Sequence, residues 1–216
     1  MSRALVRKPA PRLAREERVD RILDAAHNVF RKKGYGNTAV SEIAARMGLV
    51  EANVYKYFGT KRELLLKVLD RWYDEMFSEY ARALADVSGT RARVRLLVAQ
   101  HLTSVKKHPL LCRLMFREVR SEEDYPGSSL HTQNRRYTQL LVDVLRQGVV
   151  AGELRDDLPP ALLRDMIYGG IEHHAWNYLC GRGGLEIEAV AERITELVWN
   201  GASTRRRTSP LRKRKA

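Results

Sequence analysis

The most distinctive side chains of this sequence lie in one short stretch, residues 50 to 58, which combines tyrosine, lysine and asparagine with two apolar anchors. On a helix, Val54 and Phe58 would face a small core, because residues four apart share a face. That arrangement leaves six residues to face outward: Glu51, Ala52, Asn53, Tyr55, Lys56 and Tyr57. Tyrosine hydroxyls and lysine ammonium groups reach phosphates, and short polar side chains enter a major groove. The stretch therefore predicts recognition of a DNA duplex; the alternative is a solvated helix of a small helical domain.

Other helices must position this stretch. Apolar residues at spacings of three and four predict a helix over about residues 15 to 33, which Gly34 ends. Thr38 is placed to cap a second helix. Gly48 supplies the sharp turn before the third helix, which we expect over about residues 50 to 57.

A long fourth helix is expected from Lys61 to about Leu84. Thr60 and Glu63 form a Thr-x-x-Glu capping box at its start, and a continuous apolar stripe follows. Because this helix runs well beyond the first three, it would tie the N-terminal head to the rest of the chain.

The head residues recur in a recognisable order: Thr38, Val40, Ile43, Ala44, Gly48, Leu49, Val54, Tyr55, Tyr57, Phe58, Lys61 and Leu64. Over residues 15 to 70 this pattern resembles the head of the TetR family of bacterial transcriptional regulators (TetR/AcrR-like), while the remainder matches that family only in helical layout and length. The resemblance implies that the DNA backbone is held by Thr38, Tyr55, Lys56, Tyr57 and Lys61. It also implies that the residues nearest the base edges are Ser41, Glu51, Ala52 and Asn53.

Two residues depart from the family pattern. Val50 stands where many relatives have Ser or Thr, so the recognition helix is expected to lack a side-chain cap. Glu51 would repel phosphates, but its carboxylate can accept a hydrogen bond from cytosine or complement the positive end of the helix dipole. We favour the dipole interpretation.

The net charge of +13 is concentrated at the two ends of the chain. Residues 1 to 15 hold five Lys or Arg and no acid, and residues 205 to 216 hold seven and no acid, so the body between them is close to neutral. Segments of this composition cannot bury a core. We therefore expect a disordered basic arm (1–14), a helix-turn-helix DNA-binding domain (15–60), a ligand-binding and dimerisation domain (61–203) and a disordered basic tail (204–216).

The basic arm has two open interpretations, since it would either follow the DNA backbone into a minor groove or remain solvated and add only salt-dependent affinity. The basic tail is expected to be solubilising.

The rest of the chain is expected to be helical. Breakers such as Pro109, Pro126 and the glycines before residue 187 divide it into helices over about 91–107, 109–120, 129–151, 160–180 and 187–200. No alternating strand pattern is present, which predicts an all-α fold of about nine helices: a three-helix DNA-binding domain fused through the long fourth helix to a larger C-terminal helical domain.

The last two helices are the candidate dimer interface. Small and apolar residues share broad faces there: Met166, Ile167, Gly170, Ile171 and His174 on the first, and Val190, Ile194, Leu197 and Val198 on the second. The family resemblance implies a four-helix contact between two copies. The alternative is that these faces complete the core of a single chain. A homodimer is favoured, because a two-fold pair of heads reads two half-sites.

The family resemblance also implies a ligand cavity among the remaining helices. Its candidate wall is apolar and aromatic: Trp72, Tyr73, Met76, Phe77, Tyr80, His101, Val105, Met115, Phe116, Tyr137, Leu141 and Trp176. Taken singly, each of these residues is better explained as core, because every helical bundle needs such a stripe. The arginines that would meet an anionic group, such as a carboxylate or coenzyme A phosphates, are Arg113, Arg117, Arg135 and Arg136.

Other chemistry finds little support. His173 and His174 point about 100 degrees apart on a helix, so with His101 they make a poor metal site, and no metal or cofactor is expected. No nucleophile elbow, phosphate loop or zinc-protease motif occurs, which argues against an enzyme. Cys112 and Cys180 fit no disulfide framework, and neither a signal peptide nor a long apolar run is present. We expect a cytoplasmic, nucleoid-associated bacterial protein with no membrane partner.

We predict that the protein is a ligand-responsive transcriptional regulator, a repressor that binds a palindromic operator as a homodimer. A small, mostly apolar effector, of acyl or acyl-coenzyme A type, would release it through the long fourth helix. A coupling of about 1 to 3 kcal/mol would change occupancy some 5- to 150-fold. The alternatives are an activator, an effector-independent architectural protein, or a nucleic-acid or membrane-surface protein that binds through its polybasic ends.

Overall fold

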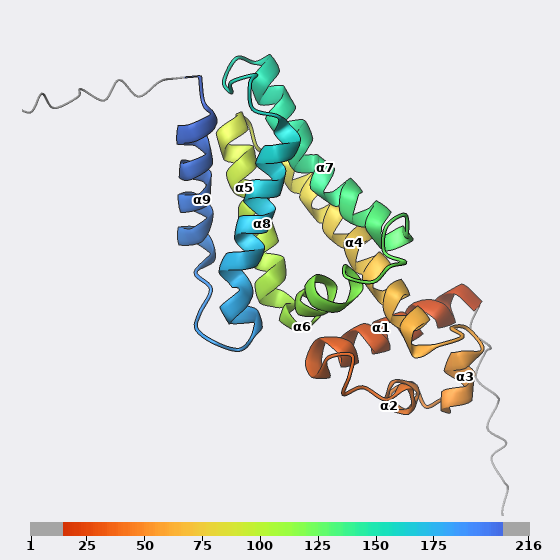
Figure 1. The fold of residues 1–216 in the computed structure, drawn as a ribbon. Helices are drawn as coiled ribbons and strands as arrows, with labels where there is room; N and C mark the ends of the chain where they lie inside the picture. The colour runs from red at the N-terminus through yellow and green to blue at the C-terminus, as the bar shows by residue number, and fades with distance from the viewer. Residues whose placement is uncertain (1–14, 205–216) are drawn as a thin grey trace, which may run out of the picture. The chain divides into compact units, whose positions relative to one another are not determined.

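The computed structural model describes residues 15 to 204 as nine α-helices and one π-helical turn, with a single isolated bridge between Leu154 and Ser203 (Figure 1). The predicted all-α class is therefore confirmed. The predicted basic arm at 1–14, and all of the predicted basic tail except Thr204, lie outside the described residues. Within that described part, no helix has the length and apolar character needed to cross a membrane. The chain divides into two compact units at Val68.

The first unit holds α1 (Arg15–Lys33), α2 (Val40–Ala45), α3 (Glu51–Tyr55) and the first two turns of α4 (Lys61–Ala85). Its core is made of the apolar faces that the sequence spacing predicts: Ile22, Ala26, Val29, Phe30, Val40, Ile43, Ala44, Val54, Phe58, Leu64 and Leu65. Gly34 and Gly48 both have positive φ, a conformation that disfavours side chains with a Cβ. These two residues allow the sharp turns that separate α1 from α2 and α2 from α3.

The predicted cap at Thr38 is wrong. The N-cap of α2 is Ala39, which makes no side-chain cap, and α2 begins only at Val40. The Thr38 side chain is buried, and its hydroxyl donates backward to the Gly34 carbonyl at 2.7 Å. The threonine therefore closes the turn after α1 and leaves the first amides of α2 uncapped by a side chain.

The structure confirms the missing cap at Val50 and one half of the capping box at Thr60 and Glu63. Val50 is the N-cap of α3 and provides no side-chain hydrogen bond, as expected. At the start of α4, the Glu63 amide donates to the Thr60 hydroxyl at 3.0 Å, which is one half of the predicted capping box. The Glu63 carboxylate accepts from the Gly59 amide at 2.8 Å, so the reciprocal bond reaches one residue further back than the motif implies.

The second unit contains the rest of α4 together with α5 (Thr90–Lys107), α6 (Pro109–Leu114), the π-helical turn η1 (Met115–Val119), α7 (Ser129–Val150), α8 (Pro160–Leu179) and α9 (Ile187–Ala202). Helix α5 is the centre of this unit, because it packs against α6, α7, α8 and α9 (Figure 1). The predicted helix over 109–120 is interrupted, since the winding changes from α to π at Met115. Hydrogen bonds join α7 to α4; for example, the Ser129 hydroxyl donates to the Asp70 carboxylate at 2.9 Å.

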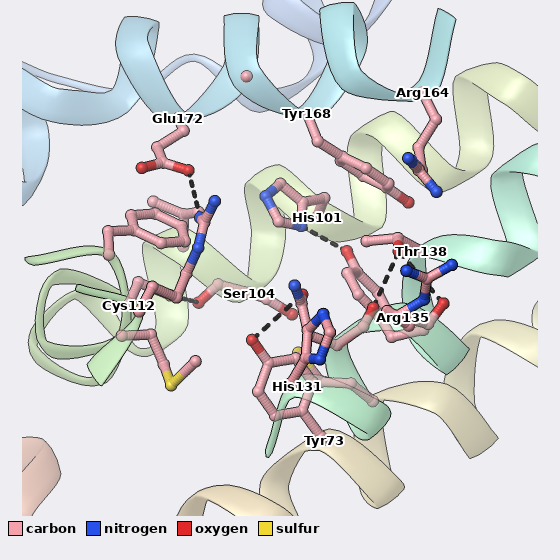
Figure 2. A pocket seen from close by; sticks show the side chains of 18 of the residues that line it. Tyr73, His101, Ser104, Cys112, His131, Arg135, Thr138, Arg164, Tyr168 and Glu172 are labelled. Atoms are coloured by element: carbon pink, nitrogen blue, oxygen red, sulfur yellow. Dashed lines mark hydrogen bonds and ion pairs between the residues drawn. The ribbon is translucent and has the colours of Figure 1, made fainter. Parts of the chain in front are cut away.

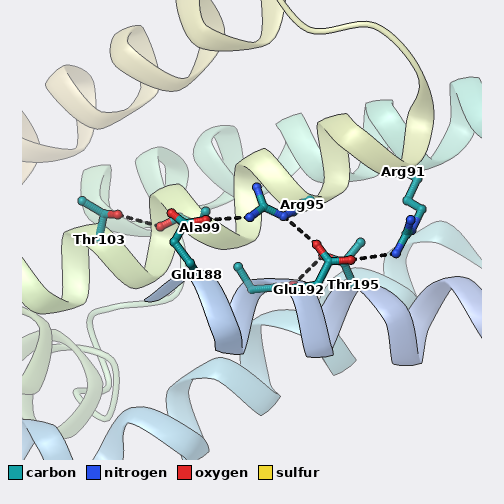
Figure 3. A network of polar contacts seen from close by, with 8 residues as sticks. Arg91, Arg95, Ala99, Thr103, Glu188, Glu192 and Thr195 are labelled. Carbon is teal, nitrogen blue, oxygen red and sulfur yellow. Dashed lines mark hydrogen bonds and ion pairs between the residues drawn. The ribbon is translucent and has the colours of Figure 1, made fainter. Parts of the chain in front are cut away.

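A charged clamp fixes α9 along α5 (Figure 3). The Arg95 guanidinium lies 2.6 Å from the Glu188 carboxylate and 2.7 Å from that of Glu192. Arg91 adds a third contact, 2.8 Å from Glu192. Each pair is partly solvated, so each contributes at most about 1 kcal/mol, and the clamp sets the register of α9 more than it stabilises the unit.

The candidate dimer residues divide into two groups. Ile167 and Ile171 are buried within this chain, as the core alternative holds. Met166 and Leu197 are 67% and 75% exposed. Gly170 and His174 are exposed as well, and the remaining three residues on α9 are half-buried: Val190, Ile194 and Val198. Their role in a dimer stays a prediction.

Candidate DNA interface and effector cavity

Helix α3 presents one apolar side inward and its polar residues outward. Val54 is fully buried in the head, while Tyr55 is 40% exposed and Val50 is 66% exposed. Ala52 and Lys56 are exposed, and the other predicted contacts on this helix and the turn after it are half-buried: Glu51, Asn53 and Tyr57. The predicted outward face is therefore present over a single short helix.

The flanks of α3 carry further predicted contact residues. Ser41 on α2 is exposed, and Lys61 is half-buried at the start of α4. The Lys61 ammonium lies 4.3 Å from the centre of the Tyr35 ring, which holds this cation at the surface of the head. Thr38 is buried and bonded internally, so of the predicted backbone contacts it is the least accessible.

Two carboxylates of the head interact with neighbouring side chains of the same unit. Glu42 is 2.7 Å from the Lys33 ammonium and 3.4 Å from the Arg46 guanidinium. The hydrogen bond from Lys33 lowers the pKa of Glu42, with a smaller contribution from Arg46. On α3, desolvation and then the nearby Glu51 carboxylate raise the pKa of the Tyr55 hydroxyl. Glu51 thus interacts with a side chain of its own helix.

A cavity of about 420 Å³ lies within the second unit. Helices α4, α5, α6, α7 and α8 and the η1 turn contribute its walls (Figure 2). The predicted wall residues that line it are Trp72, Tyr73, Met76, His101, Val105, Met115, Phe116 and Tyr137. Its volume is in the range of pockets that hold small molecules.

Four predicted wall residues do not line the cavity. Leu141 is fully buried one turn beyond Tyr137 and belongs to the core. Phe77 lies under the Arg136 guanidinium, 3.8 Å from the ring centre, and Trp176 packs near Arg117. Tyr80 is buried and bonded to backbone and hydroxyl groups of α5. Helical spacing puts all four on or near the correct stripe, but it does not tell which turn of a helix reaches the cavity.

Most of the polar wall of the cavity was not predicted from the sequence. The additional lining residues are Ser104, Cys112, Arg120, His131, Asn134, Thr138, Arg164, Asp165, Tyr168, Gly169 and Glu172. A signal was present, because Tyr168 and Glu172 are four residues apart on α8, and Asn134 and Thr138 are four apart on α7. These polar residues share helical faces with apolar wall residues, but apolar periodicity identifies only the apolar residues of a face.

The inner wall is a cluster of neutral rings. His101 Nδ1 is hydrogen-bonded to the Tyr137 hydroxyl, and the two rings stack with centres 5.8 Å apart. The Tyr168 ring lies 4.8 Å from His101, while its hydroxyl is buried with no hydrogen-bond partner within residues 15–204. Burial lowers the pKa of His101 to about 4, and the Arg120 charge acts in the same direction. At neutral pH this wall is therefore polar but uncharged.

The charged groups of the cavity are mostly paired. Arg120 lies 2.7 Å from the Glu172 carboxylate (Figure 2). Arg164 lies 2.8 Å from Asp165. Arg135 also lines the cavity from α7, is exposed, and has no carboxylate partner among the described residues. With both carboxylates neutralised by arginines, the cavity has an excess positive charge at Arg135. A bound molecule with one anionic group fits that balance.

A short outward-facing helix in a helix-turn-helix head, followed by a helical unit with an internal cavity, defines a DNA-binding regulator that responds to a small molecule. Residues 22–68 match the family described as bacterial regulatory proteins, tetR family, and residues 88–202 match the tetracyclin repressor-like C-terminal domain. The second match alone spans more than half of the chain. The protein therefore belongs to the TetR family, and the resemblance seen in its head is confirmed.

Individual relatives are distant in sequence but similar in fold. The fatty acid metabolism regulator protein of Bacillus subtilis (strain 168) is 22% identical over 180 residues, which cover 83% of this chain and 93% of that protein. The crystal structure of FadR from Bacillus subtilis with stearoyl-CoA has a TM-score of 0.73 at 22% identity, covering 84% of this chain and 98% of that one. A putative regulator from Saccharomonospora viridis with choline has a TM-score of 0.77 at 20% identity, covering 88% of this chain and 100% of that one.

These findings establish the general function. The chain is a transcriptional regulator of the TetR family, whose members bind operator DNA as dimers and respond to small-molecule effectors. The contact residues on α3 and the chemistry of the effector belong to the proposals below.

Proposed function

We propose that this regulator is a repressor whose effector is an anionic acyl compound, of which an acyl-coenzyme A is the model. The observation that carries this proposal is the cavity of about 420 Å³ with one unpaired arginine, Arg135, in its wall. Apolar and aromatic side chains such as Trp72, Met76 and Phe116 would contact the acyl part. The Arg135 guanidinium would contact the anionic part.

The relatives support the acyl class over a cationic one. One of them is named as a regulator of fatty acid metabolism, and one similar structure contains stearoyl-CoA. Another similar structure contains choline, a quaternary ammonium compound. A cation is best held by aromatic faces beside an unpaired carboxylate, whereas here Glu172 and Asp165 already face arginines. The charge balance of the cavity therefore favours an anion.

On the DNA side, we propose that Tyr55, Lys56, Tyr57 and Lys61 hold phosphates, with a minor contribution from the buried Thr38. Ser41, Ala52 and Asn53 would approach base edges, together with Glu51. The exposed positions Met166, Gly170, His174 and Leu197 would form the contact between two copies, with Val190, Ile194 and Val198 at its margin. We place the action of the protein at the bacterial nucleoid and assign it no catalytic step.

Helix α4 is the proposed route between the two functions. It begins at Lys61 in the head and contributes Trp72, Tyr73 and Met76 to the cavity. A continuous helix that is displaced at one end moves at the other, so an effector pressing on the cavity wall would change the spacing of the two heads in a dimer. Only about 1 to 3 kcal/mol of coupling is needed for this response.

The test uses the full chain and an operator selected from random duplexes with the wild-type protein. Octanoyl-coenzyme A is expected to release that operator in a fluorescence anisotropy titration, and choline is not. Arg135→Gln should weaken octanoyl-coenzyme A binding about fivefold, the size expected for one partly solvated charge contact. Arg136→Gln is the matched control, because Arg136 is adjacent and already lies 2.8 Å from Asp74. Release by choline but not by any acyl-coenzyme A would overturn the proposal.

A further inference from the structure

His131, at the start of α7, carries a hydrogen-bond donor whose position on the ring is fixed by a backbone amide. The Gly127 amide donates to His131 Nδ1 at 3.0 Å. A backbone N–H can only donate, so Nδ1 is the unprotonated nitrogen and the proton of the neutral ring lies on Nε2. A charged ring also carries a proton on Nε2. This nitrogen is therefore a donor in either state of the ring.

The neighbours of His131 hold its ring and leave Nε2 unoccupied. The Tyr125 ring packs against the imidazole with ring centres 5.3 Å apart, and the Gly127 bond fixes one edge. The side chain is half-buried and lines the cavity (Figure 2). Within residues 15–204, Nε2 has no hydrogen-bond partner. The donor is thus held in place before any ligand binds.

Arg135 lies one helical turn further along α7. Residues four apart on a helix are neighbours, with about 5 to 6 Å between their Cβ atoms. Both side chains line the same cavity, and the Arg135 guanidinium has no carboxylate partner in the described part of the chain. Arginine offers donors and no acceptor, as does His131 Nε2–H. Two adjacent donors of this kind fit a negatively charged group that has at least two acceptor oxygens.

The other polar groups of the cavity wall near these donors are bonded to other parts of the chain. The Thr138 hydroxyl donates to the Asn134 carbonyl at 2.9 Å, and Asn134 Oδ1 lies 3.5 Å from the Tyr73 hydroxyl. The carboxylates of Asp165 and Glu172 lie against other arginines. His131 and Arg135 are therefore the two donors of α7 that remain for a ligand.

We propose that His131 and Arg135 form an oxyanion site on α7, in which Arg135 supplies the charge and His131 Nε2–H donates to a second oxygen of the same group. The inference rests on the proposed anionic acyl effector and adds His131 as a residue that selects its anionic group. His131 lies in the first turn of α7, where the positive end of the helix dipole also favours negative charge. A carboxylate and a phosphate share the chemistry that this site recognises.

Two substitutions of His131 separate the donor from the contact that positions it. His131→Asn keeps an acceptor near the position of Nδ1 but has no donor at the position of Nε2, whereas His131→Gln keeps that donor and loses the acceptor. In isothermal titrations of the full chain with octanoyl-coenzyme A, His131→Asn should bind about fivefold more weakly than the wild type, and His131→Gln should recover most of the affinity. Thr132→Ala, exposed on the same helix and outside the cavity wall, is the control and should bind like the wild type.

Titrations with two further ligands identify the group that the site binds. Octanoyl-coenzyme A carries phosphates, octanoate carries a carboxylate, and octan-1-ol carries neither. If His131→Asn weakens octanoyl-coenzyme A but not octanoate, the group is a phosphate; if it weakens octanoate, the group is a carboxylate, and either result supports the site. An equal loss for octan-1-ol would show that His131 only supports the cavity wall and would overturn the inference.

A double-mutant cycle tests whether the two residues hold one group. Independent contacts would multiply, so His131→Asn combined with Arg135→Gln would weaken octanoyl-coenzyme A binding about 25-fold. Contacts to a single group are coupled, and we expect about a tenfold loss instead. The 25-fold result would overturn the shared site and leave Arg135 as a separate contact.

The outcomes separate this inference from the proposal on which it rests. Undiminished binding of both octanoyl-coenzyme A and octanoate by His131→Asn would refute the oxyanion site while leaving an acyl effector in place. No binding of either compound by the wild-type chain would remove the acyl effector and the oxyanion site together.

Discussion

The two units of this protein direct their polar side chains in opposite ways. In the head, Tyr55 and Lys56 face outward from a core that contains almost only apolar atoms. In the second unit, His101, Tyr137 and Tyr168 face inward around a cavity. Water solvates the first set until a duplex displaces it, whereas the second set is satisfied only by its neighbours or by a bound molecule. The difference supports the proposals that the head binds DNA on its outer surface and that the second unit binds its effector inside.

The two units also differ in what stabilises them. Helices α2 and α3 have six and five residues, far too short to be stable by themselves, so the head depends on a few buried side chains. Val54 and Phe58 are the two that hold the recognition helix. Four helices of the second unit, α5, α7, α8 and α9, have 16 to 22 residues, and the α5–α9 clamp is an additional constraint.

Removing the Phe58 side chain, the larger of the two that anchor the recognition helix, should destabilise the head without destabilising the second unit. Phe58→Ala is expected to destabilise the head by about 3 to 5 kcal/mol, the usual cost of deleting a buried phenylalanine side chain. Hydrogen exchange should show lost amide protection over residues 22–58 and unchanged protection over residues 90–202. Operator binding should fail while octanoyl-coenzyme A still binds. Phe58→Leu, which keeps most of the apolar volume, should restore much of the protection; equal loss of protection in both units would contradict their independence.

Removing the outward side chains should affect binding without affecting folding. Tyr55→Ala combined with Lys61→Ala is expected to weaken operator binding about 100-fold, because two phosphate contacts are lost, and to reduce its salt dependence. Fluorescence anisotropy at two salt concentrations measures both effects. Lys32→Ala removes an exposed positive charge at the end of α1 and is the control. Undiminished binding by the double variant would defeat the assignment of α3 and its flanks.

A truncation complements that experiment. A chain without residues 1–14 and 205–216 should keep most of its sequence-specific binding, since the proposed base contacts all lie on α2 and α3. If the truncated chain lost specific binding while the double variant kept it, the polybasic alternative would be favoured.

The head could be predicted almost residue by residue from the sequence, because local rules determine it. The spacing of Ile22, Ala26 and Val29 predicts α1. Gly34 and Gly48 predict the turns between α1 and α2 and between α2 and α3. The prediction of a cap at Thr38 was wrong because a threonine hydroxyl can either accept from an amide ahead of it or donate to a carbonyl four residues behind it. Here it donates to the carbonyl of Gly34.

The cavity could be predicted only in part, because long-range packing determines it. Apolar periodicity correctly placed Trp72, Met76 and Tyr137 on the inner side of their helices. It could not tell that α7 and α8 would bring Asn134 and Tyr168 into the same cavity, since residues so far apart in sequence meet only through tertiary structure. The widened turn at Met115, which begins the η1 segment, had no local signal either.

The pH dependence of stability tests whether the inner wall of the cavity is neutral. The folded chain protonates His101 only near pH 4, whereas an unfolded chain does so near 6.5, so below pH 6.5 the unfolded state binds more protons. Stability should therefore fall as the pH is lowered, by about 2 kcal/mol between pH 7 and pH 5 for this one residue. Urea titrations followed by tryptophan fluorescence measure it, because Trp72, Trp176 and Trp199 all lie in the second unit. His101→Gln should lose this component of the pH dependence, and His131→Gln, on the same cavity wall, should keep it. Identical pH profiles for the wild type and His101→Gln would mean that His101 is solvated or charged in the folded state, and the inner wall could then no longer be described as neutral.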